Sequence, residues 1–176
     1  MRVELLFHTD LDAIKNVLRS KHVPFDPSKV LEHVVYMFEI EDCSRVTTHQ
    51  LVRHRVASYD QESQRFSSAS REGFVTPPTI QSNAEALKVY DDALKSAYVA
   101  FEKMGSLGVP KEDARYVLPS AIKTKLVMTV TARSLMHIVW QRTALQAQWE
   151  VRELVGKLYA AAKEATPELW STIIER

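Results

Sequence analysis

Cysteine and glycine are both scarce in this chain of 176 residues, which contains one cysteine, Cys43, and four glycines. A single cysteine excludes a disulfide framework and a zinc site built from several cysteines, and it is typical of a reducing compartment. The glycines, at positions 73, 105, 108 and 156, form neither a GxGxxG fingerprint nor a P-loop. A bound nucleotide is therefore not expected in a Rossmann-type cradle.

A large excess of charge of one sign is also missing. The chain has 23 Lys and Arg against 22 Asp and Glu, a formal net charge of +1, which is not typical of a general nucleic-acid binder. The N-terminal MRVELLFHTDLD turns polar after seven residues and is typical of neither a signal peptide nor a membrane span. We therefore expect a single domain over residues 1–176, in the cytoplasm, with neither a membrane nor a nucleic acid as partner, and no metal site.

Hydrophobic periodicity predicts strands and helices that alternate loosely along the chain. Strands rich in β-branched and aromatic residues are expected at residues 3–7, 33–40 and 125–132. Helices are expected from Asp10 to about Ser20, at residues 44–55, 83–104, 133–146 and 149–163, and briefly after Pro110 and Pro167, with a loop over residues 57–78. This pattern favours the α+β class, with a small, mostly antiparallel sheet packed with long helices.

The segment RHRVASYDQESQRF, residues 53–66, gathers three arginines, a histidine and a serine without one lysine. Arginine offers a rigid fork of donors that matches phosphate or a planar carbonyl edge, whereas lysine is a flexible point charge. Successive helical residues lie about 100° apart, so Arg53, His54 and Arg55 are expected to face different directions. Gln50, one turn earlier, shares their side of the helix. A solvated helix end is the simpler alternative.

Ser63, Gln64 and Arg65 form the second half of that segment. A loop serine beside an arginine can hold a phosphate with its hydroxyl, backbone N–H groups and a guanidinium. A nucleophilic serine needs an adjacent base, and the sequence does not place one. From spacing alone, a polar turn is the alternative.

Arg115, in EDARYVLP, lies where a helix is expected to begin, against the usual preference of the helix dipole. A ligand would explain it, and so would an ion pair with Glu112 or Asp113. Cys43 has acidic neighbours, which raise the pKa of a thiol, so it is not expected to act as a methylating nucleophile.

TARSLMHIVWQR, residues 131–142, carries polar side chains on one side of a predicted helix. Arg133, His137 and Gln141 are one turn apart, and Arg142 lies further round at the far end. Three such residues on one face are weak evidence for a site.

RHR, seven residues and then Ser resembles the signature of the flavin-dependent thymidylate synthases, the ThyX family. Here it reads Arg53-His54-Arg55, residues 56–62 and Ser63-Gln64-Arg65. LEHVVYMFEI and CSRVTTHQLV are similar to the strand and helix that precede the signature, and EDARYVLP, TARSLMHIVWQR and AQWEVREL resemble the C-terminal half. The resemblance covers about residues 30 to 160.

The resemblance implies an α+β homotetramer that binds FAD where subunits meet and converts dUMP to dTMP. It implies 5,10-methylenetetrahydrofolate as the one-carbon donor, NADPH as the reductant and no active-site cysteine. Contacts to dUMP are implied for Gln50, Arg53, Gln61, Ser63, Gln64, Arg65, Arg115 and Arg142. Contacts to FAD are implied for Arg53, His54, Arg55, Gln61, Thr131, Arg133 and His137, with Ser28 as a further candidate.

Two of these residues carry an expected catalytic role. Arg142 matches the arginine that grips the uracil edge, where a guanidinium would stabilise negative charge on O2 and N3. Ser63 is expected to position dUMP rather than to attack it, because its flanks offer no base. The chain departs from the family at Phe66, where tyrosine is usual, and at Thr131, where asparagine is frequent.

Two alternatives remain open at this point. One is a related flavin-dependent enzyme that methylates C5 of UMP or of a modified pyrimidine nucleotide, because spacing does not read the 2′ position. The other is an arginine-rich module that binds nucleic acid, against which the near-zero net charge argues.

Overall fold

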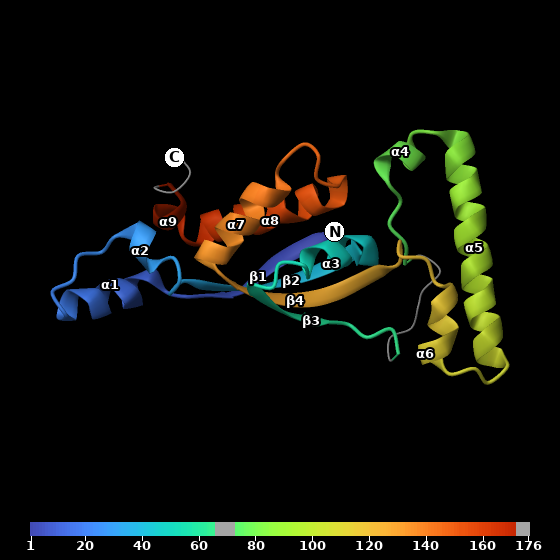
Figure 1. Ribbon diagram of the computed structural model, residues 1–176, viewed down its shortest axis with the longest axis horizontal. Coiled ribbons are helices and arrows are strands. Elements are labelled where there is room, and N and C mark those ends of the chain that lie inside the picture. The colour runs from blue at the N-terminus through green and yellow to red at the C-terminus, as the bar shows by residue number, and fades with distance from the viewer. Residues whose placement is uncertain (66–72, 172–176) are drawn as a thin grey trace. The chain divides into compact units, whose positions relative to one another are not determined.

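The computed structural model describes residues 1–65 and 73–171 (Figure 1). It divides into two compact units, of which unit 1 comprises Met1–Glu41, Gln50–Asp60 and Leu126–Arg176, and unit 2 comprises Asp42–His49 and Gln61–Lys125. In chain order the elements are β1 (Arg2–His8), α1 (Leu11–Ser20), α2 (Pro27–Val30), β2 (Val35–Ser44), α3 (Arg45–Leu51), β3 (Ala57–Gln61), α4 (Pro78–Gln81), α5 (Ala84–Ser106), α6 (Lys111–Ala114), the 3-10 turn η1 (Arg115–Val117), β4 (Lys123–Thr131), α7 (Ala132–Arg142), α8 (Trp149–Ala165) and α9 (Pro167–Ser171). The predicted α+β class is confirmed, whereas the single domain stays a prediction.

Most of the four-stranded sheet belongs to unit 1, in the order β1-β2-β4-β3. β1 pairs antiparallel with β2, from Arg2 opposite Glu41 to His8 opposite Tyr36. Alternate side chains of β2 and β4 are buried because successive residues of a strand point to opposite faces. The buried set is Tyr36, Phe38 and Ile40 on β2 and Leu126, Met128 and Val130 on β4.

Helices α7 and α8 provide the other half of this core, and Figure 1 shows them on the same side of the strands. They pack against each other, and α8 also packs against β1. Their apolar stripes include Leu135, Ile138, Leu154 and Leu158, each fully buried. Burial of one such side chain stabilises a fold by about 1.5–3 kcal/mol, so this layer holds α7, with its polar face, firmly against the sheet.

A buried polar triad fastens α9 to strand β2. The Tyr36 hydroxyl lies 2.5 Å from Thr166 Oγ1 and accepts a hydrogen bond from Trp170 Nε1 at 3.0 Å. Burial raises the pKa of Tyr36. The phenol therefore keeps its proton and satisfies two buried polar groups without adding charge to the core.

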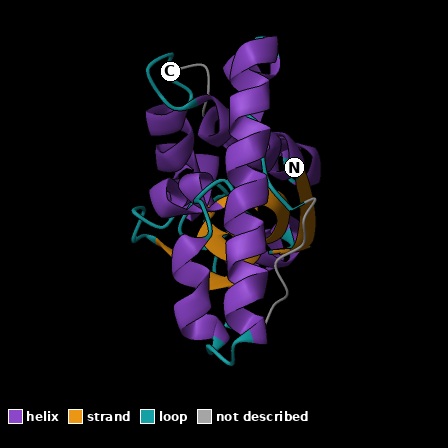
Figure 2. Ribbon diagram, turned by 90° about the vertical axis from the view of Figure 1, so that its right-hand side faces the viewer, coloured by secondary structure: helices purple, strands orange, loops and turns teal. Residues whose placement is uncertain are grey.

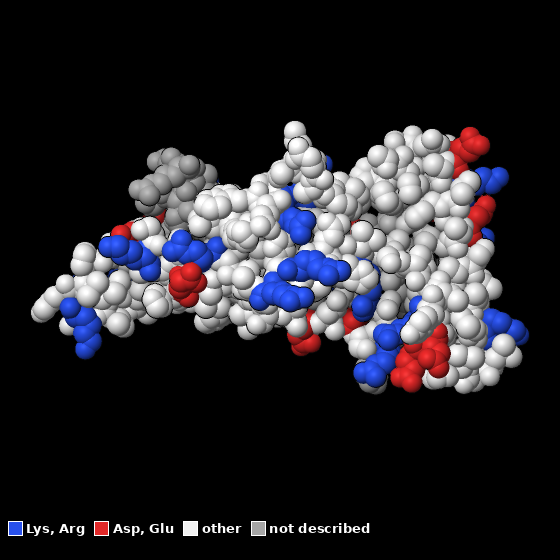
Figure 3. Space-filling model, viewed as in Figure 1, with Lys and Arg blue, Asp and Glu red and all other residues white. Residues whose placement is uncertain are grey.

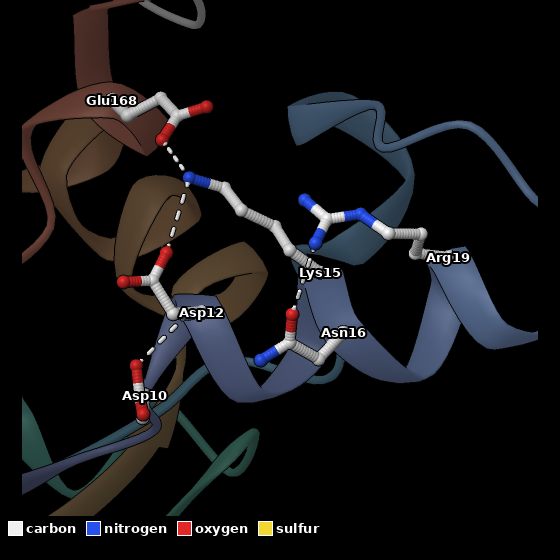
Figure 4. A network of polar contacts seen from close by, with 6 residues as sticks. All are labelled: Asp10, Asp12, Lys15, Asn16, Arg19 and Glu168. Carbon is white, nitrogen blue, oxygen red and sulfur yellow. Dashed lines mark hydrogen bonds and ion pairs between the residues drawn. The ribbon is translucent and has the colours of Figure 1, made fainter.

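Helix α1 has no buried residue and is held instead by polar contacts at its surface. Lys15 forms ion pairs with Glu168 of α9 and, at 3.6 Å, with Asp12, and Asp10 caps the helix by accepting from the Asp12 N–H at 2.9 Å (Figure 4). The Lys15 ammonium also lies 5.1 Å from the centre of the Phe25 ring. Surface ion pairs contribute little singly, so this network mainly orients the helix.

Unit 2 is built on α5, which Figure 2 shows with α6 alongside it. Asn83 caps α5 by accepting from the N–H groups of Glu85 and Ala86, both at 3.1 Å, as Asn does at helix starts. The helix ends where Gly108 adopts φ +83°, a conformation that costs glycine little. Only Phe101 of α5 is buried among the described residues, so the helix presents a long exposed surface.

Three predicted elements need correction. Residues 57–61 form strand β3 rather than loop, because they pair at the edge of the sheet. The predicted helix 44–55 is β2 as far as Ser44 and then α3, which ends at Leu51, and the predicted helix 133–146 ends at Arg142. There the Val139 carbonyl accepts from both the Thr143 N–H at 3.0 Å and the Thr143 hydroxyl at 2.8 Å. No helix in the described ranges is long and apolar enough to cross a membrane.

Candidate functional site

Arg53, His54 and Arg55 lie in the turn that follows α3, not on the helix itself. The Tyr59 hydroxyl of β3 bonds to the carbonyls of Leu51 at 3.0 Å and His54 at 3.1 Å, which fixes the turn against the sheet. His54 is only 7% exposed, whereas the two arginines are exposed. His54 therefore turns inward while both arginines face solvent, and it is a turn rather than a helix that carries them; that Arg53 and Arg55 face different surfaces stays a prediction.

The buried His54 meets a residue of α7, 88 positions later in the chain. Arg142 Nε donates to His54 Nε2 at 2.9 Å. Burial lowers the pKa of His54, and the charges of Arg142 and His137 add to this effect. The RHR segment and helix α7, which are far apart in the sequence, are therefore in contact within unit 1.

His137 lies on the outward side of α7 with its neighbour one turn on. Gln141 Nε2 lies 2.8 Å from His137 Nε2, as their i, i+4 spacing predicts. Arg133, His137 and Gln141 are all exposed, and His137 and Gln141 contact one another; the role of this face toward FAD stays a prediction.

Arg133 and Ser28, both predicted flavin contacts, are neighbours in unit 1. Arg133 Nη2 donates to the Ser28 carbonyl at 3.2 Å, and its Nε donates to Glu32 Oε1 at 3.1 Å. The Ser28 hydroxyl donates to Asp26 at 2.7 Å, and together with the Ser28 N–H it lowers the pKa of that carboxyl. The first turn of α7 is thereby tied to α2.

Thr131 serves α7 as its N-cap. Its hydroxyl oxygen accepts from the Ser134 N–H at 3.2 Å and its O–H donates to Ser134 Oγ at 3.1 Å. Thr and Asn both cap helices well. Threonine in place of asparagine therefore preserves the helix cap, and the side chain carries a hydroxyl group instead of an amide.

Gln61 ends β3 in unit 2, with its amide nitrogen fully used. Nε2 donates to Thr48 Oγ1 at 3.0 Å and to Thr124 Oγ1 at 3.2 Å. An amide group has two N–H donors, so both are satisfied and the orientation of the amide is set. The carbonyl oxygen remains as the acceptor that Gln61 can present to a ligand. Gln50, on the other unit, is half-buried at the end of α3.

Ser63, Gln64 and Arg65 follow in a turn of unit 2. The Ser63 hydroxyl oxygen accepts from the Arg65 N–H at 3.3 Å, which fixes the serine as part of the turn. Arg65 Nη1 lies 3.9 Å from Glu112 Oε2, both largely exposed. An exposed pair at this distance contributes little to stability. Phe66 and Arg71 lie outside the described residues.

Arg45 and Arg115 form a pair of like charges in unit 2. Arg45 Nη2 donates to the Glu62 carbonyl at 2.7 Å, but its buried Nε has no partner. Arg115 Nε donates to the backbone carbonyl of Glu112 at 3.1 Å, and the predicted ion pair with Glu112 or Asp113 is not formed. Burial lowers the pKa of Arg45, and the charge of Arg115 lowers it further. Two guanidinium groups so arranged favour an anion.

Several arginines of the two units share this lack of negative partners. Figure 3 shows several Lys and Arg side chains that have no Asp or Glu side chain beside them. Within the described ranges, no carboxylate lies in ion-pair distance of Arg45, Arg53, Arg55, Arg115 or Arg142. In the same ranges no group of His, Cys, Asp and Glu is arranged to hold a metal ion.

Comparison with known proteins assigns the chain to a family. The model of the thymidylate synthase complementing protein family matches residues 5–168, nearly the whole chain. The chain belongs to this family. Curated relatives named flavin-dependent thymidylate synthase include that of Sulfurisphaera tokodaii, 44% identical over 143 residues, which are 80% of this chain and 55% of the relative. That of Nitratidesulfovibrio vulgaris is 39% identical over 166 residues, 90% of this chain and 66% of the relative.

This family member is short beside several of its relatives. It spans 54–62% of the length of those from Sulfurisphaera tokodaii, Sulfolobus acidocaldarius and Geobacter sulfurreducens. The described fold is that of a solved thymidylate synthase X from Helicobacter pylori with FAD and dUMP, with a TM-score of 0.78, 23% identity and coverage of 100% of both chains. That likeness shows the common fold.

Arg45 is the residue of this thymidylate synthase family member that the sequence analysis did not assign to the site. Its signal was present, because it is one of five arginines between residues 44 and 71, where lysine is absent. Arg45 is the first residue of α3, and nothing in its local sequence indicates that its Nε is buried. Only the packing within unit 2 shows that its Nε is enclosed without a partner.

Proposed function

We propose that this chain is a flavin-dependent thymidylate synthase, which methylates dUMP reductively to dTMP. The one-carbon donor is 5,10-methylenetetrahydrofolate, and NADPH supplies the reducing electrons through FAD. Membership of the family supports the reaction class. The observation that carries the proposal is the set of five arginines without carboxylate partners among the described residues, because FAD and dUMP are both anionic.

Unit 2 supplies the grip on the dUMP phosphate. Arg45 and Arg115 repel one another and neither has a carboxylate within ion-pair distance among the described residues, so the charge of a phosphate would offset the repulsion. Ser63, Gln64 and Arg65 add a hydroxyl, backbone N–H groups and a third guanidinium. Ser63 positions the nucleotide in this arrangement, since its oxygen already accepts from the Arg65 N–H.

Arg142 and Gln61 act on the uracil ring. Arg142 keeps both terminal Nη groups free when its Nε is bound to His54, so it can hold the O2–N3 edge. Positive charge there stabilises the negative charge that develops when C5 acts as a nucleophile. Gln61 offers a carbonyl oxygen whose orientation two threonines set, which suits an N–H group of the pyrimidine or the flavin. Gln50 contributes from the end of α3.

The residues assigned to FAD fit a flavin dinucleotide in charge and exposure. Arg53 and Arg55 are exposed and have no partner among the described residues, which leaves their donors for the pyrophosphate. Arg133, His137, Thr131 and Ser28 offer further polar groups on α7 and α2, and His54 closes the turn between the two arginines. When bound, FAD supplies the hydride and the means of carrying the one-carbon unit.

Two further parts of the proposal concern assembly and compartment. We place the enzyme in a homotetramer whose sites are shared between subunits, as the family resemblance implies. We place it in the cytoplasm, in agreement with the single cysteine of the chain, the buried Cys43. Light scattering of the purified FAD-bound protein tests the tetramer.

One enzymatic assay tests the function. Purified protein should be yellow or take up FAD, release the C5 hydrogen of dUMP and form dTMP with methylenetetrahydrofolate and NADPH. Parallel reactions with UMP test the alternative of a UMP methylase. Arg142→Ala should keep the flavin absorbance and lose dUMP binding and turnover. Colourless protein that ignores FAD would overturn the proposal, and near-normal turnover by Arg142→Ala at saturating dUMP would overturn the charge-stabilising role.

A further inference from the structure

His54 is buried in the middle of a segment whose other basic residues are exposed. Its ring contacts Arg142, whose Nε donates to His54 Nε2 at 2.9 Å. Arg53 and Arg55, on either side, point to solvent. Among the three residues of the signature, the histidine therefore has a partner within the chain, and that partner is the proposed uracil-binding arginine.

The contact requires one protonation state of His54. An arginine has only donors, so His54 Nε2 must carry a lone pair and the ring proton must lie on Nδ1. A protonated imidazole would face the guanidinium with a second donor and a second positive charge. Among the described residues, the charges that act on the His54 imidazole come from Arg142 and His137, both on α7, and both disfavour its protonation; the Tyr59 hydroxyl bonds to the His54 carbonyl.

The backbone around His54 is held by independent contacts. The Tyr59 hydroxyl bonds to the His54 carbonyl at 3.1 Å, and the His54 N–H donates to the Leu51 carbonyl at 3.0 Å. These contacts fix the position of the His54 imidazole on the turn between α3 and β3. The imidazole in turn fixes the guanidinium group of Arg142. Arginine loses considerable rotamer entropy when it is fixed, and here part of that loss precedes substrate binding.

We propose that His54 is a positioning residue, which holds Arg142 by its Nε so that both Nη groups face the uracil edge. The inference rests on the proposed function, because it gives Arg142 its role there. His54 acts on the reaction through Arg142 and touches neither reacting atom. The proposal predicts that any side chain with a hydrogen-bond acceptor at the position of His54 Nε2 can hold Arg142.

Two matched variants of the FAD-bound enzyme test the acceptor. The substitution His54→Gln places an amide oxygen near the position of Nε2, whereas His54→Leu has similar bulk and no acceptor. We expect His54→Gln to keep kcat/KM for dUMP within about threefold, and His54→Leu to lose roughly 10- to 100-fold, as misplacement of a catalytic group does. Flavin absorbance and thermal stability of both variants are measured in parallel. Equal losses in both variants, or no loss in His54→Leu, would overturn the proposal.

A second measurement is independent of turnover. Nitrogen NMR of isotope-labelled, FAD-bound protein reports the tautomer of each histidine, and the His54 signals are those that His54→Gln removes. We expect the Nδ1–H tautomer in the wild type, and a rise in the pKa of His54 in Arg142→Met, because a neighbouring positive charge is lost. The Nε2–H tautomer would overturn the proposal. A wild type that shows the expected tautomer but does not turn over dUMP would instead contradict the proposed function.

Discussion

Arg45→Met is expected to separate substrate binding from stability. Arg45 has a buried Nε without a partner, a lowered pKa and a neighbouring positive charge from Arg115. Among the described residues, its guanidinium donates from Nη2 to the Glu62 carbonyl at 2.7 Å, and the charge of Glu62 also favours the guanidinium. Methionine keeps the apolar stem of the side chain as far as the position of Nε and removes its charge and its donors.

The opposing contributions to stability nearly cancel. The lost charged hydrogen bond costs about 1.5–3 kcal/mol, and removal of the unpaired Nε–H returns about 1–3 kcal/mol. The free energy of unfolding should therefore stay within about 1.5 kcal/mol of the wild type, and relief of the repulsion from Arg115 favours the variant. Loss of a charge-assisted bond to the phosphate should raise the Kd for dUMP about 10- to 100-fold, the equivalent of about 1.5–3 kcal/mol.

The assay pairs urea unfolding with titration of dUMP into the FAD-bound protein. Lys95→Met, at an exposed position on α5, is the control because it removes one positive charge from the same unit without touching a buried group. A fall in stability of about 3 kcal/mol or more, with unchanged affinity for dUMP, would refute the reasoning and make Arg45 a structural residue. Equal effects of the two variants on affinity would show that only net charge matters.

Three further outcomes follow from the geometry. Tyr59→Phe removes the hydroxyl that bonds to the Leu51 and His54 carbonyls and should lower the free energy of unfolding by about 1–3 kcal/mol; unchanged urea midpoints would contradict this. Ser63→Ala should keep measurable dTMP formation and raise KM for dUMP, and complete inactivity with unchanged dUMP affinity would restore a nucleophilic role. Because the pKa of His54 is lower in the folded protein than in the unfolded chain, the unfolded chain binds a proton at a higher pH. The free energy of unfolding should therefore fall as the pH drops below about 6.5. His54→Gln should flatten that part of the pH profile, and an identical profile would exclude His54 as its source.

The sequence alone supported the class of fold because local patterns agree with packing in most of the chain. Runs rich in β-branched and aromatic residues marked β2 and β4, and the long amphipathic pattern from Asn83 marked α5. The predicted ends of helices were less accurate where contacts with residues outside the helix determine where it ends. α3 ends at Leu51 because a tyrosine from the next strand bonds to the carbonyls of the turn, and no local signal announces that contact.

For the candidate site, too, some features could be predicted from the sequence and others depend on the tertiary structure. The spacing of RHR and Ser63, read with its distant companions, was enough to indicate the family, and the polar face of α7 followed from helical periodicity. Tertiary structure alone decided that His54 turns inward to Arg142, which lies 88 residues away, and that Arg45 is enclosed beside Arg115. Sequence spacing determines which side chains an element presents to one side. Burial and partners depend on segments that are remote in the chain, so the desolvation and charge that shift a pKa arise only when those segments pack together.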